Sequence, residues 1–168
     1  MPNSQFSNKV RVRVCAVIVQ ESSILLAKIN SPTRSEPIWM PPGGGVELGE
    51  SLEEALHREI SEETGFEVEK KQLLWIHEFI EEPYHAIEFY FRCDVTGGEL
   101  KKGLDPELES NEQMLLDLDF IPFDENKSYS IEPQFIKEFC KNGGQFFDEV
   151  RHLKNPPLKG AQGDDLAL

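Results

Sequence analysis

The chain has 168 residues, of which 39% are hydrophobic, and it carries 17 Lys and Arg against 31 Asp and Glu, a formal net charge of −14. This length predicts a single domain with a sizeable core, and the hydrophobic content excludes a disordered acidic chain. The acidity argues against DNA or an anionic membrane as the main partner, because both attract basic surfaces.

The cysteines and the N-terminal segment indicate the cellular compartment of the protein. Cys15, Cys93 and Cys140 are widely spaced and match no zinc-binding pattern. Met1–Lys9 does not resemble a secretory signal, and the longest apolar run, Val14–Val19, is too short to cross a bilayer. We therefore expect a cytoplasmic protein with reduced thiols and no membrane partner.

Two strands are predicted near the N-terminus. Val10–Gln20 alternates arginine with valine and then becomes apolar, which is typical of a strand that starts at a cleft and ends buried. Ile24–Ile29 is the second strand, and the turn at Glu21–Ser23 predicts a hairpin between them. Two loops are expected next, at Asn30–Pro37 and at Pro41–Gly45.

A helix is predicted to begin at Ser51. Ser51 and Glu54 form a capping-box pattern. Leu56 and Ile60 follow at helical spacing, and Gly65 is expected to end the helix.

Beyond this helix the sequence predicts three further strands, an acidic loop, a second helix and a last helical turn. In chain order they are strands at Gln72–Ile80 and Ala86–Val95, an acidic loop at Gly103–Gln113, a strand near Leu118–Pro122, a helix at Pro133–Lys141 and a last helical turn at Phe146–Leu153. Because no internal repeat or boundary is visible, we expect residues 1–153 to form one domain and residues 154–168 to form a flexible tail.

Half of the net charge lies around the first predicted helix. Residues 47–67 hold eight Glu against one Arg, a local net charge of −7. At about 100° per residue, Glu59 and Glu63 fall on the same side as Leu56, which faces the protein, and Glu62 borders that side. Buried carboxylates repel one another, so a cation must accompany them. Because no His or Cys shares this side, Mg²⁺ or Mn²⁺ is favoured over Zn²⁺.

A glycine run, Gly43–Gly45, precedes the acidic helix. Its backbone carbonyls can reach a metal ion, and its amides can approach a phosphate. Together the run and the helix form one spaced motif: Gly44, five residues, Glu50, seven residues, Arg58-Glu59-Ile60, one residue, Glu62-Glu63, one residue, Gly65-Phe66. With nine specified positions in 23 residues, this motif resembles the Nudix box without a departure.

The resemblance to the Nudix (MutT-like) family covers roughly residues 9–150. It implies an α/β (α+β) fold: an α/β/α sandwich with a mixed central sheet, one catalytic helix after the glycine-rich loop and a C-terminal helix. It also implies hydrolysis, with Mg²⁺ or Mn²⁺, of the pyrophosphate bond in a nucleoside diphosphate linked to another moiety. A nucleoside triphosphate or an ADP-ribose-like molecule would be the small-molecule substrate, and a homodimer is frequent among similar proteins.

The resemblance further implies the metal ligands. Glu59 and Glu63 would be the principal ligands, and Glu62 would share the ions or act as the general base. The carbonyl of Gly43 or Gly44 would supply an extra ligand.

Other catalytic roles follow in the same way. Arg58 would orient the carboxylates, with Glu50 as its partner. In this family the general base can also come from a later loop, where Glu107, Glu109 and Glu112 are available. Of these we favour Glu112, because it lies just before the last predicted strand; each of the three could equally be an exposed loop acid.

Residues that select the substrate lie outside the box. Lys28 lies where MutT-like proteins often carry a phosphate-contacting base, and Arg11, Arg13 and Arg92 are further candidates. Tyr84 could stack on a nucleobase. Each of these side chains could equally be a surface charge or a packing residue.

The substrate subgroup stays open at this point. A downstream proline marks an ADP-ribose class and a tyrosine marks a dinucleoside polyphosphate class, and Pro83 and Tyr84 approximately match both. The alternatives to an active pyrophosphohydrolase are a catalytically weak nucleotide-binding sensor of the same fold and a dinucleoside polyphosphate hydrolase. An isoprenoid isomerase of related fold is disfavoured, because the cysteines it would need lie in apolar strand patterns.

Overall fold

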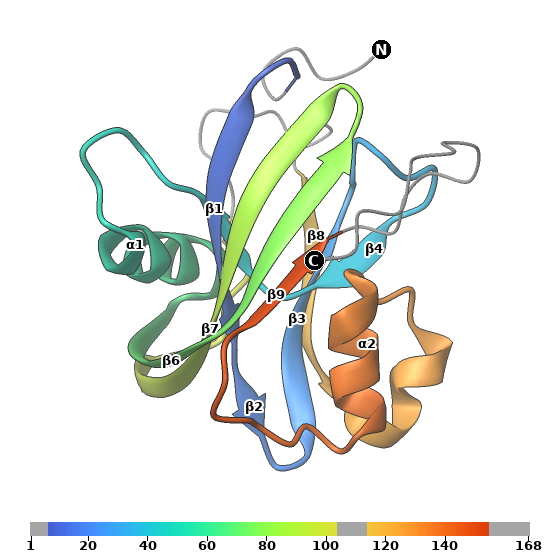
Figure 1. The fold of residues 1–168 in the computed structure, drawn as a ribbon. Helices are drawn as coiled ribbons and strands as arrows, with labels where there is room; N and C mark the ends of the chain where they lie inside the picture. Colours follow the sequence, from blue (N-terminus) through green and yellow to red (C-terminus); the bar gives the residue numbers. More distant parts are fainter. Residues whose placement is uncertain (1–6, 104–113, 155–168) are drawn as a thin grey trace.

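The computed structural model describes residues 7–103 and 114–154, which are arranged in layers (Figure 1). In chain order the elements are β1 (Val10–Val17), β2 (Val19–Gln20), β3 (Ser23–Ile29), β4 (Ile38–Met40), β5 (Gly43–Gly45), α1 (Leu52–Thr64), β6 (Phe66–Glu81), β7 (Tyr84–Gly98), β8 (Leu115–Pro122), the 3-10 turn η1 (Phe123–Ser128), α2 (Gln134–Lys141) and β9 (Arg151–Lys154). One sheet has the order β5-β1-β7-β6-β9, and the other contains β2, β3, β4 and β8. Helices α1 and α2 lie on opposite sides of the molecule (Figure 1).

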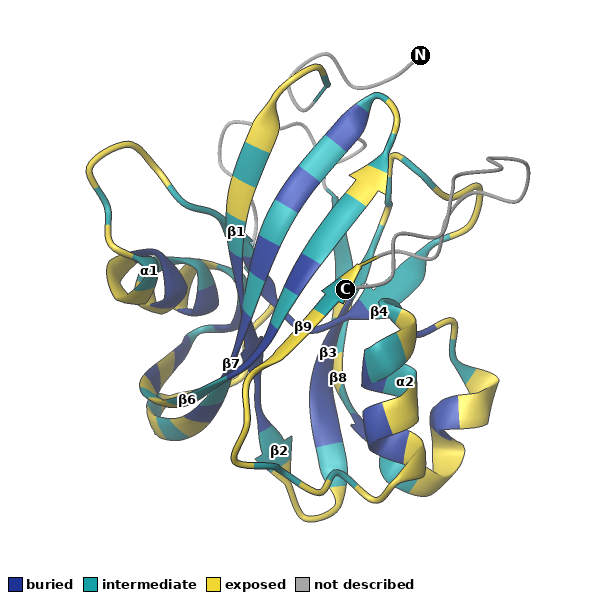
Figure 2. Cartoon of the chain, viewed as in Figure 1, coloured by how far each residue is buried: buried dark blue, intermediate teal, exposed yellow. Residues whose placement is uncertain are grey.

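Strand β1 has the burial that its sequence pattern predicts. Its first half alternates between exposed and partly buried residues, and the stretch from Val14 to Val17 is buried. The strand pairs in parallel with β7 and antiparallel with β5, so it lies inside the five-stranded sheet. Figure 2 shows the same burial in the lower parts of β1 and β3.

The predicted hairpin between the first two strands is only partly correct. The short strand β2 pairs with β3, whereas β1 belongs to the other sheet. The change of sheet occurs at Ile18, which is buried and whose carbonyl accepts a hydrogen bond from the Leu25 amide at 2.9 Å. One continuous apolar run therefore serves two sheets, which a strand pattern does not reveal.

The predicted glycine loop is also partly a strand. Gly43–Gly45 forms β5, antiparallel to β1. Gly43 has a φ of +152°, and a Cβ on this residue would overlap the carbonyl oxygen of Val14. Strand propensity gives no sign of this pairing, because glycine is depleted in strands.

Helix α1 is confirmed together with its boundaries. The Ser51 side chain accepts a hydrogen bond from the Glu54 amide, and the Glu54 carboxylate accepts one from the Ser51 amide. Gly65 ends the helix in the left-handed conformation, with φ 74°. Leu56 and Ile60 are fully buried in the core layer between α1 and the five-stranded sheet.

The long hairpin of β6 and β7 is confirmed, and both strands exceed their predicted bounds. Three register irregularities interrupt their pairing. Such bulges break the alternation of apolar and polar residues, which explains why the pattern predicts shorter strands.

The predicted helical turn at Phe146–Leu153 is wrong. Strand β9 pairs in parallel with β6 at the edge of the sheet, and the Phe147 ring lies 5.1 Å from the ring of Trp75. A short apolar segment does not distinguish a helix from a strand, and here the open edge of β6 decides. The predicted strand near Leu118–Pro122 and the predicted helix at Pro133–Lys141 are present as β8 and α2.

The core has two layers, one on each face of the five-stranded sheet. One cluster lies against α1, and the other fills the space between the two sheets and α2. This mixed α/β architecture agrees with the expected fold class. Among the described residues, no helix is both long and apolar enough to cross a membrane.

Candidate active site

A cleft of about 990 Å³ is lined by residues from both sheets. On the α1 side its lining includes Glu59 and Glu63, the glycines of β5, and Arg11 and Arg13 of β1. Elsewhere the lining is largely apolar, with Ile38, Phe79, Tyr84, Leu115, Phe135 and Leu153 among its members, and it also includes charged residues such as Arg34, Glu132 and Glu138. The cleft therefore joins a charged region to an apolar one.

Two glutamates of the predicted metal site face this cleft from α1. The Glu63 Oε2 accepts a hydrogen bond from the Gly43 amide at 2.9 Å. Gly44 lies directly against Glu59, because a Cβ on Gly44 would overlap the Glu59 carboxylate. Glu62 is different: its side chain is 62% exposed and does not line the cleft. The structure thus brings Glu59, Glu63 and the glycine run together and leaves Glu62 at the border.

Arg58 makes the contacts expected of a residue that orients carboxylates. Its Nε and NH2 groups donate to the two Glu50 oxygens at 2.8 and 2.9 Å, and its NH1 donates to Glu59 at 2.9 Å. NH2 also donates to the Gly45 carbonyl at 2.9 Å, and NH1 lies 3.4 Å from Glu62. The bidentate pair with Arg58 lowers the pKa of Glu50 to about 2. Arg58 therefore connects α1 to the loop before it and to β5.

The electrostatics of these two partly buried glutamates favour a cation. Burial raises the pKa of Glu63 to about 7 and also raises the pKa of Glu59. Carboxylates that resist ionisation in this way are stabilised by a divalent ion, and an all-oxygen set suits Mg²⁺ or Mn²⁺. Within residues 7–103 and 114–154, no three His, Cys, Asp or Glu side chains are close enough together to hold a metal ion. The donor chemistry fits a divalent cation with two side-chain ligands from α1.

Two of the predicted phosphate-binding residues also reach the cleft. Arg11 lies next to β5, where a Cβ on Gly45 would come within 3.2 Å of its NH2 group. Burial, with the nearby charge of Arg13, lowers the pKa of Arg11 to about 10. Arg13 forms an ion pair with Glu88 at 2.7 Å. The polar side of the cleft therefore combines the carboxylates of Glu59, Glu63 and Glu88 with two guanidinium groups.

The remaining predicted residues are scattered. Tyr84 lines the cleft. Lys28 and Arg92 are not among the described residues that line it; the Lys28 Nζ lies 5.9 Å from the ring centre of Trp39, and the Arg92 guanidinium lies 4.5 Å from that of Phe146. The loop acids Glu107, Glu109 and Glu112 fall outside the described residues.

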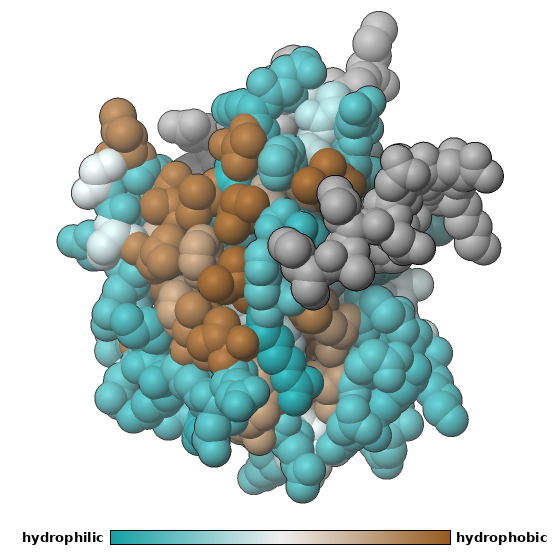
Figure 3. Space-filling view, in the orientation of Figure 1, coloured by the Kyte–Doolittle hydropathy of each residue, from teal (hydrophilic) through white to brown (hydrophobic). Residues whose placement is uncertain are grey.

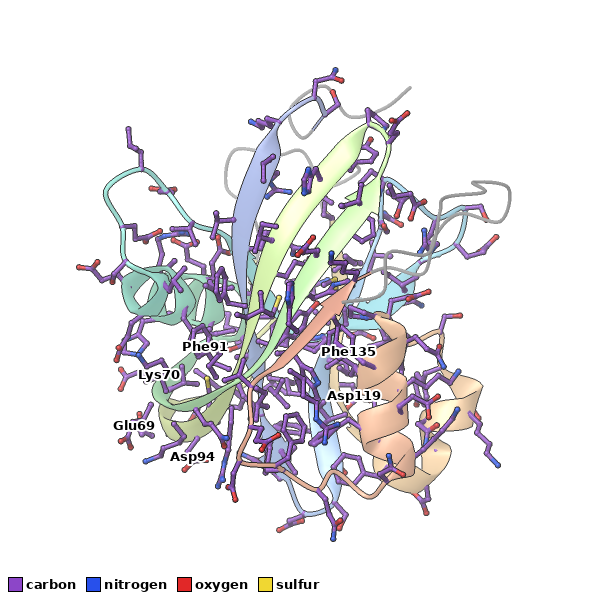
Figure 4. All side chains as sticks on the ribbon, in the orientation of Figure 1. Glu69, Lys70, Phe91, Asp94, Asp119 and Phe135 are labelled. Atoms are coloured by element: carbon purple, nitrogen blue, oxygen red, sulfur yellow. The ribbon has the colours of Figure 1, made fainter. Side chains whose placement is uncertain are left out.

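Sequence reasoning missed Glu88 and His77, which also line the cleft. The His77 Nδ1 lies 2.8 Å from the Glu88 Oε2, and both residues are 4% exposed. Phe135 of α2, which is labelled in Figure 4, has its ring 5.1 Å from that of His77. The sequence signal that could have identified these two residues is an ionisable side chain within an apolar strand pattern, on the same face as other polar residues.

Comparisons with known proteins identify the family of this chain. The family model described as NUDIX domain matches residues 9–139. An ADP-ribose pyrophosphatase of Methanocaldococcus jannaschii is 40% identical over 140 residues, which are 79% of this chain and 75% of that relative. The 8-oxo-dGDP phosphatase NUDT18 of Homo sapiens is 32% identical over 61% of this chain, which spans only 32% of that protein. The solved structure of a NUDIX hydrolase from Nitrosomonas europaea has a TM-score of 0.65 at 23% identity and covers 83% of this chain and 93% of its own.

The fold and the carboxylate-bearing helix after a glycine strand thus define the class of protein. The chain belongs to the Nudix family. It is a Nudix hydrolase, as the resemblance of its 23-residue motif implies.

Proposed function

We propose that this Nudix hydrolase uses Mg²⁺ or Mn²⁺ to hydrolyse the pyrophosphate bond of an ADP-ribose-like nucleoside diphosphate. The observation that supports this most is the cleft, which joins partly buried Glu59 and Glu63 to Arg11 and Arg13 and continues into an apolar region. A nucleoside diphosphate linked to a second moiety has the matching parts: a polyanionic centre and a less polar nucleoside. The archaeal relative named an ADP-ribose pyrophosphatase supports the choice of substrate.

Each group of the polar side would have its own task. Glu59 and Glu63 would hold the cation, with the carbonyl of Gly43 or Gly44 as a further oxygen ligand. The bound ion would neutralise the phosphates and lower the pKa of a water ligand. Arg58 would hold Glu59 in place through its 2.9 Å hydrogen bond, and the Gly43 amide would hold Glu63.

The attacking water must lose a proton as its oxygen bonds to phosphorus and the bridging P–O bond breaks. We propose Glu62 as one acceptor of that proton. Its exposed carboxylate is next to the two proposed ligands, and its contact with Arg58 is long, at 3.4 Å, so Arg58 holds it only weakly. Glu112 is the other acceptor proposed. Replacing each by glutamine distinguishes them, since loss of the base lowers kcat and leaves metal binding intact.

A substrate panel tests the proposed function. With MgCl₂, we expect ADP-ribose to yield AMP and ribose 5-phosphate, identified by chromatography of the products. Hydrolysis of 8-oxo-dGDP, dinucleoside polyphosphates or nucleoside triphosphates in place of ADP-ribose would reassign the substrate. Tight nucleotide binding without any turnover would favour the sensor and contradict the proposal.

Partner and compartment form part of the same proposal. The net charge of −14 supports a small anionic ligand delivered with a cation and opposes binding of DNA. Cys15, Cys93 and Cys140 are unpaired and buried, which supports a cytoplasmic, reducing environment. A homodimer is also part of this proposal, and it is tested by measuring the molar mass of the protein by light scattering.

A further inference from the structure

Arg13, Glu88 and His77 form one transverse row across the sheet. The pairing register places Arg13 opposite Glu88 and Glu88 opposite His77, so β1, β7 and β6 each contribute one member. The Arg13 NH1 donates to the Glu88 Oε1 at 2.7 Å. The His77 Nδ1 lies 2.8 Å from the Glu88 Oε2, to which the Tyr90 hydroxyl also donates at 3.0 Å. Both oxygens of Glu88 are therefore engaged.

This row is too buried to be an ordinary surface ion pair. Glu88 and His77 are each 4% exposed, and the Arg13 side chain is 19% exposed. Buried ion pairs are often no more stable than apolar residues of the same size. Stability alone therefore does not account for a glutamate in the middle of an apolar strand.

The row lies in the cleft that contains the acidic site. Arg13, Glu88 and His77 line the same cavity as Glu59 and Glu63. Arg13 also pairs in register with Gly45, the last residue of the glycine strand. In the part of the chain that the structure describes, the Arg13 Nε is buried without a hydrogen-bond partner.

We infer that Glu88, held by His77 and Tyr90, is a positioning residue that fixes the Arg13 guanidinium for contact with the substrate's phosphates. The inference rests on the proposed function for the identity of that anion. A guanidinium held in advance loses less side-chain freedom when it binds an anion. Glu88 itself does not contact the substrate, because a carboxylate repels phosphate and its two oxygens already have partners.

A double-mutant cycle with a non-hydrolysable ligand tests this. The probe is methylenediphosphonate with MgCl₂, a pyrophosphate analogue with a P–C–P bridge, titrated calorimetrically into wild type, Arg13→Gln, Glu88→Gln and the double variant. We expect each single substitution to weaken binding by about tenfold, the size of one hydrogen bond to a charged group. The double variant is expected to bind no more weakly than Arg13→Gln, because Glu88 acts through Arg13.

The matched control is Glu78→Gln. Glu78 lies next to His77 on β6 but on the opposite face, where it makes its own histidine contact with His152 at 2.7 Å. This variant is expected to bind the probe like wild type. A merely structural role for Glu88 would lower the melting temperature and the bound stoichiometry without changing the Kd of the folded fraction.

The outcomes separate this inference from the proposed function. Wild-type affinity in Glu88→Gln, independent losses that multiply in the double variant, or no binding of the probe to wild type would each overturn the inference. If the double-mutant cycle gives the expected result but no nucleotide of the substrate panel is hydrolysed, the proposed function is overturned and the inference about Glu88 is not. If Glu88→Gln does not fold, His77→Phe serves instead: it preserves ring packing against Phe135, removes the Nδ1 contact and is expected to weaken binding by about threefold.

Discussion

On β1, β6 and β7, successive side chains point to opposite faces of the five-stranded sheet, and these faces carry different chemistry. The cleft face presents Arg13, Glu88 and His77 in one row. The opposite face presents Val12 and Ile87, which pair with each other one position before Arg13 and Glu88 in the register of β1 and β7. Figure 3 shows hydrophobic residues gathered over this second face, and Val12 is 39% exposed there.

At the row of Arg13, Glu88 and His77, the two faces invert the usual arrangement of a sheet, in which apolar residues lie inside and polar ones outside. Elsewhere the space between the two sheets is filled by apolar residues. In the row itself ionisable groups are buried between the sheets, and part of the outer face is apolar. Because burial of charge opposes folding, the cleft face is arranged for binding an ion or a ligand more than for stability. Substitutions on the two faces should therefore separate activity from stability.

Glu63→Gln should have the largest effect and should act on activity alone. Loss of a proposed metal ligand is expected to lower kcat for ADP-ribose by more than about a hundredfold, since even the partners of metal ligands are worth about 10–100-fold. The melting temperature should not fall, because a neutral amide replaces a carboxyl whose pKa burial raises. Full activity of this variant, measured at saturating MgCl₂, would refute the metal assignment.

Leu56→Ala should act on stability alone. Leu56 is fully buried in the layer between α1 and the sheet, so its truncation is expected to lower the free energy of unfolding by about 2–5 kcal/mol, measured by urea denaturation. Leu48→Ala is the control: that leucine is fully exposed, and its loss should change stability by less than about 0.5 kcal/mol. Equal losses in the two variants would contradict the described packing of α1.

Gly44→Ala tests the close approach of β5 to the helix. A Cβ would overlap the Glu59 carboxylate, so the carboxylate must move out of its position beside Arg58. We expect kcat/KM to fall by about tenfold or more, because small displacements of catalytic groups are costly. An unchanged kcat/KM would show that the position of Glu59 is not critical for the reaction.

Val12→Thr should have the smallest effect and sharpens the contrast between the faces. Val12 lies between two arginines of the cleft face but points the other way. We expect a change of less than about 0.5 kcal/mol in stability and no change in kcat/KM. A change in molecular mass by light scattering would instead assign the apolar face to contact between copies of the chain.

Sequence patterns correctly predicted those elements that are determined by residues close together in the sequence. The capping box of Ser51, the stop at Gly65 and the carboxylates of α1 depend on residues within a few turns of one another. The Nudix motif is read from the same short stretch. For helix α1 and its boundaries, sequence and structure agree.

Features that depend on distant pairing could not be predicted in this way. Arg13 and Glu88 are 75 positions apart, and they meet because β1 runs parallel to β7. Alternation groups Glu88 with Arg92 but does not say which residues of that face reach the cleft, and Arg92 packs on Phe146 instead. The strand β9 likewise depends on the open edge of β6.

Strand β9 has a practical consequence for handling the protein. Its four residues satisfy the backbone groups of β6 at Trp75–Glu78, and its Leu153 also forms part of the cleft wall. An unpaired strand edge is a template for aggregation. Removal of residues 151–154 would therefore expose that edge and breach the wall of the cleft at once, so affinity tags and truncations belong beyond Lys154.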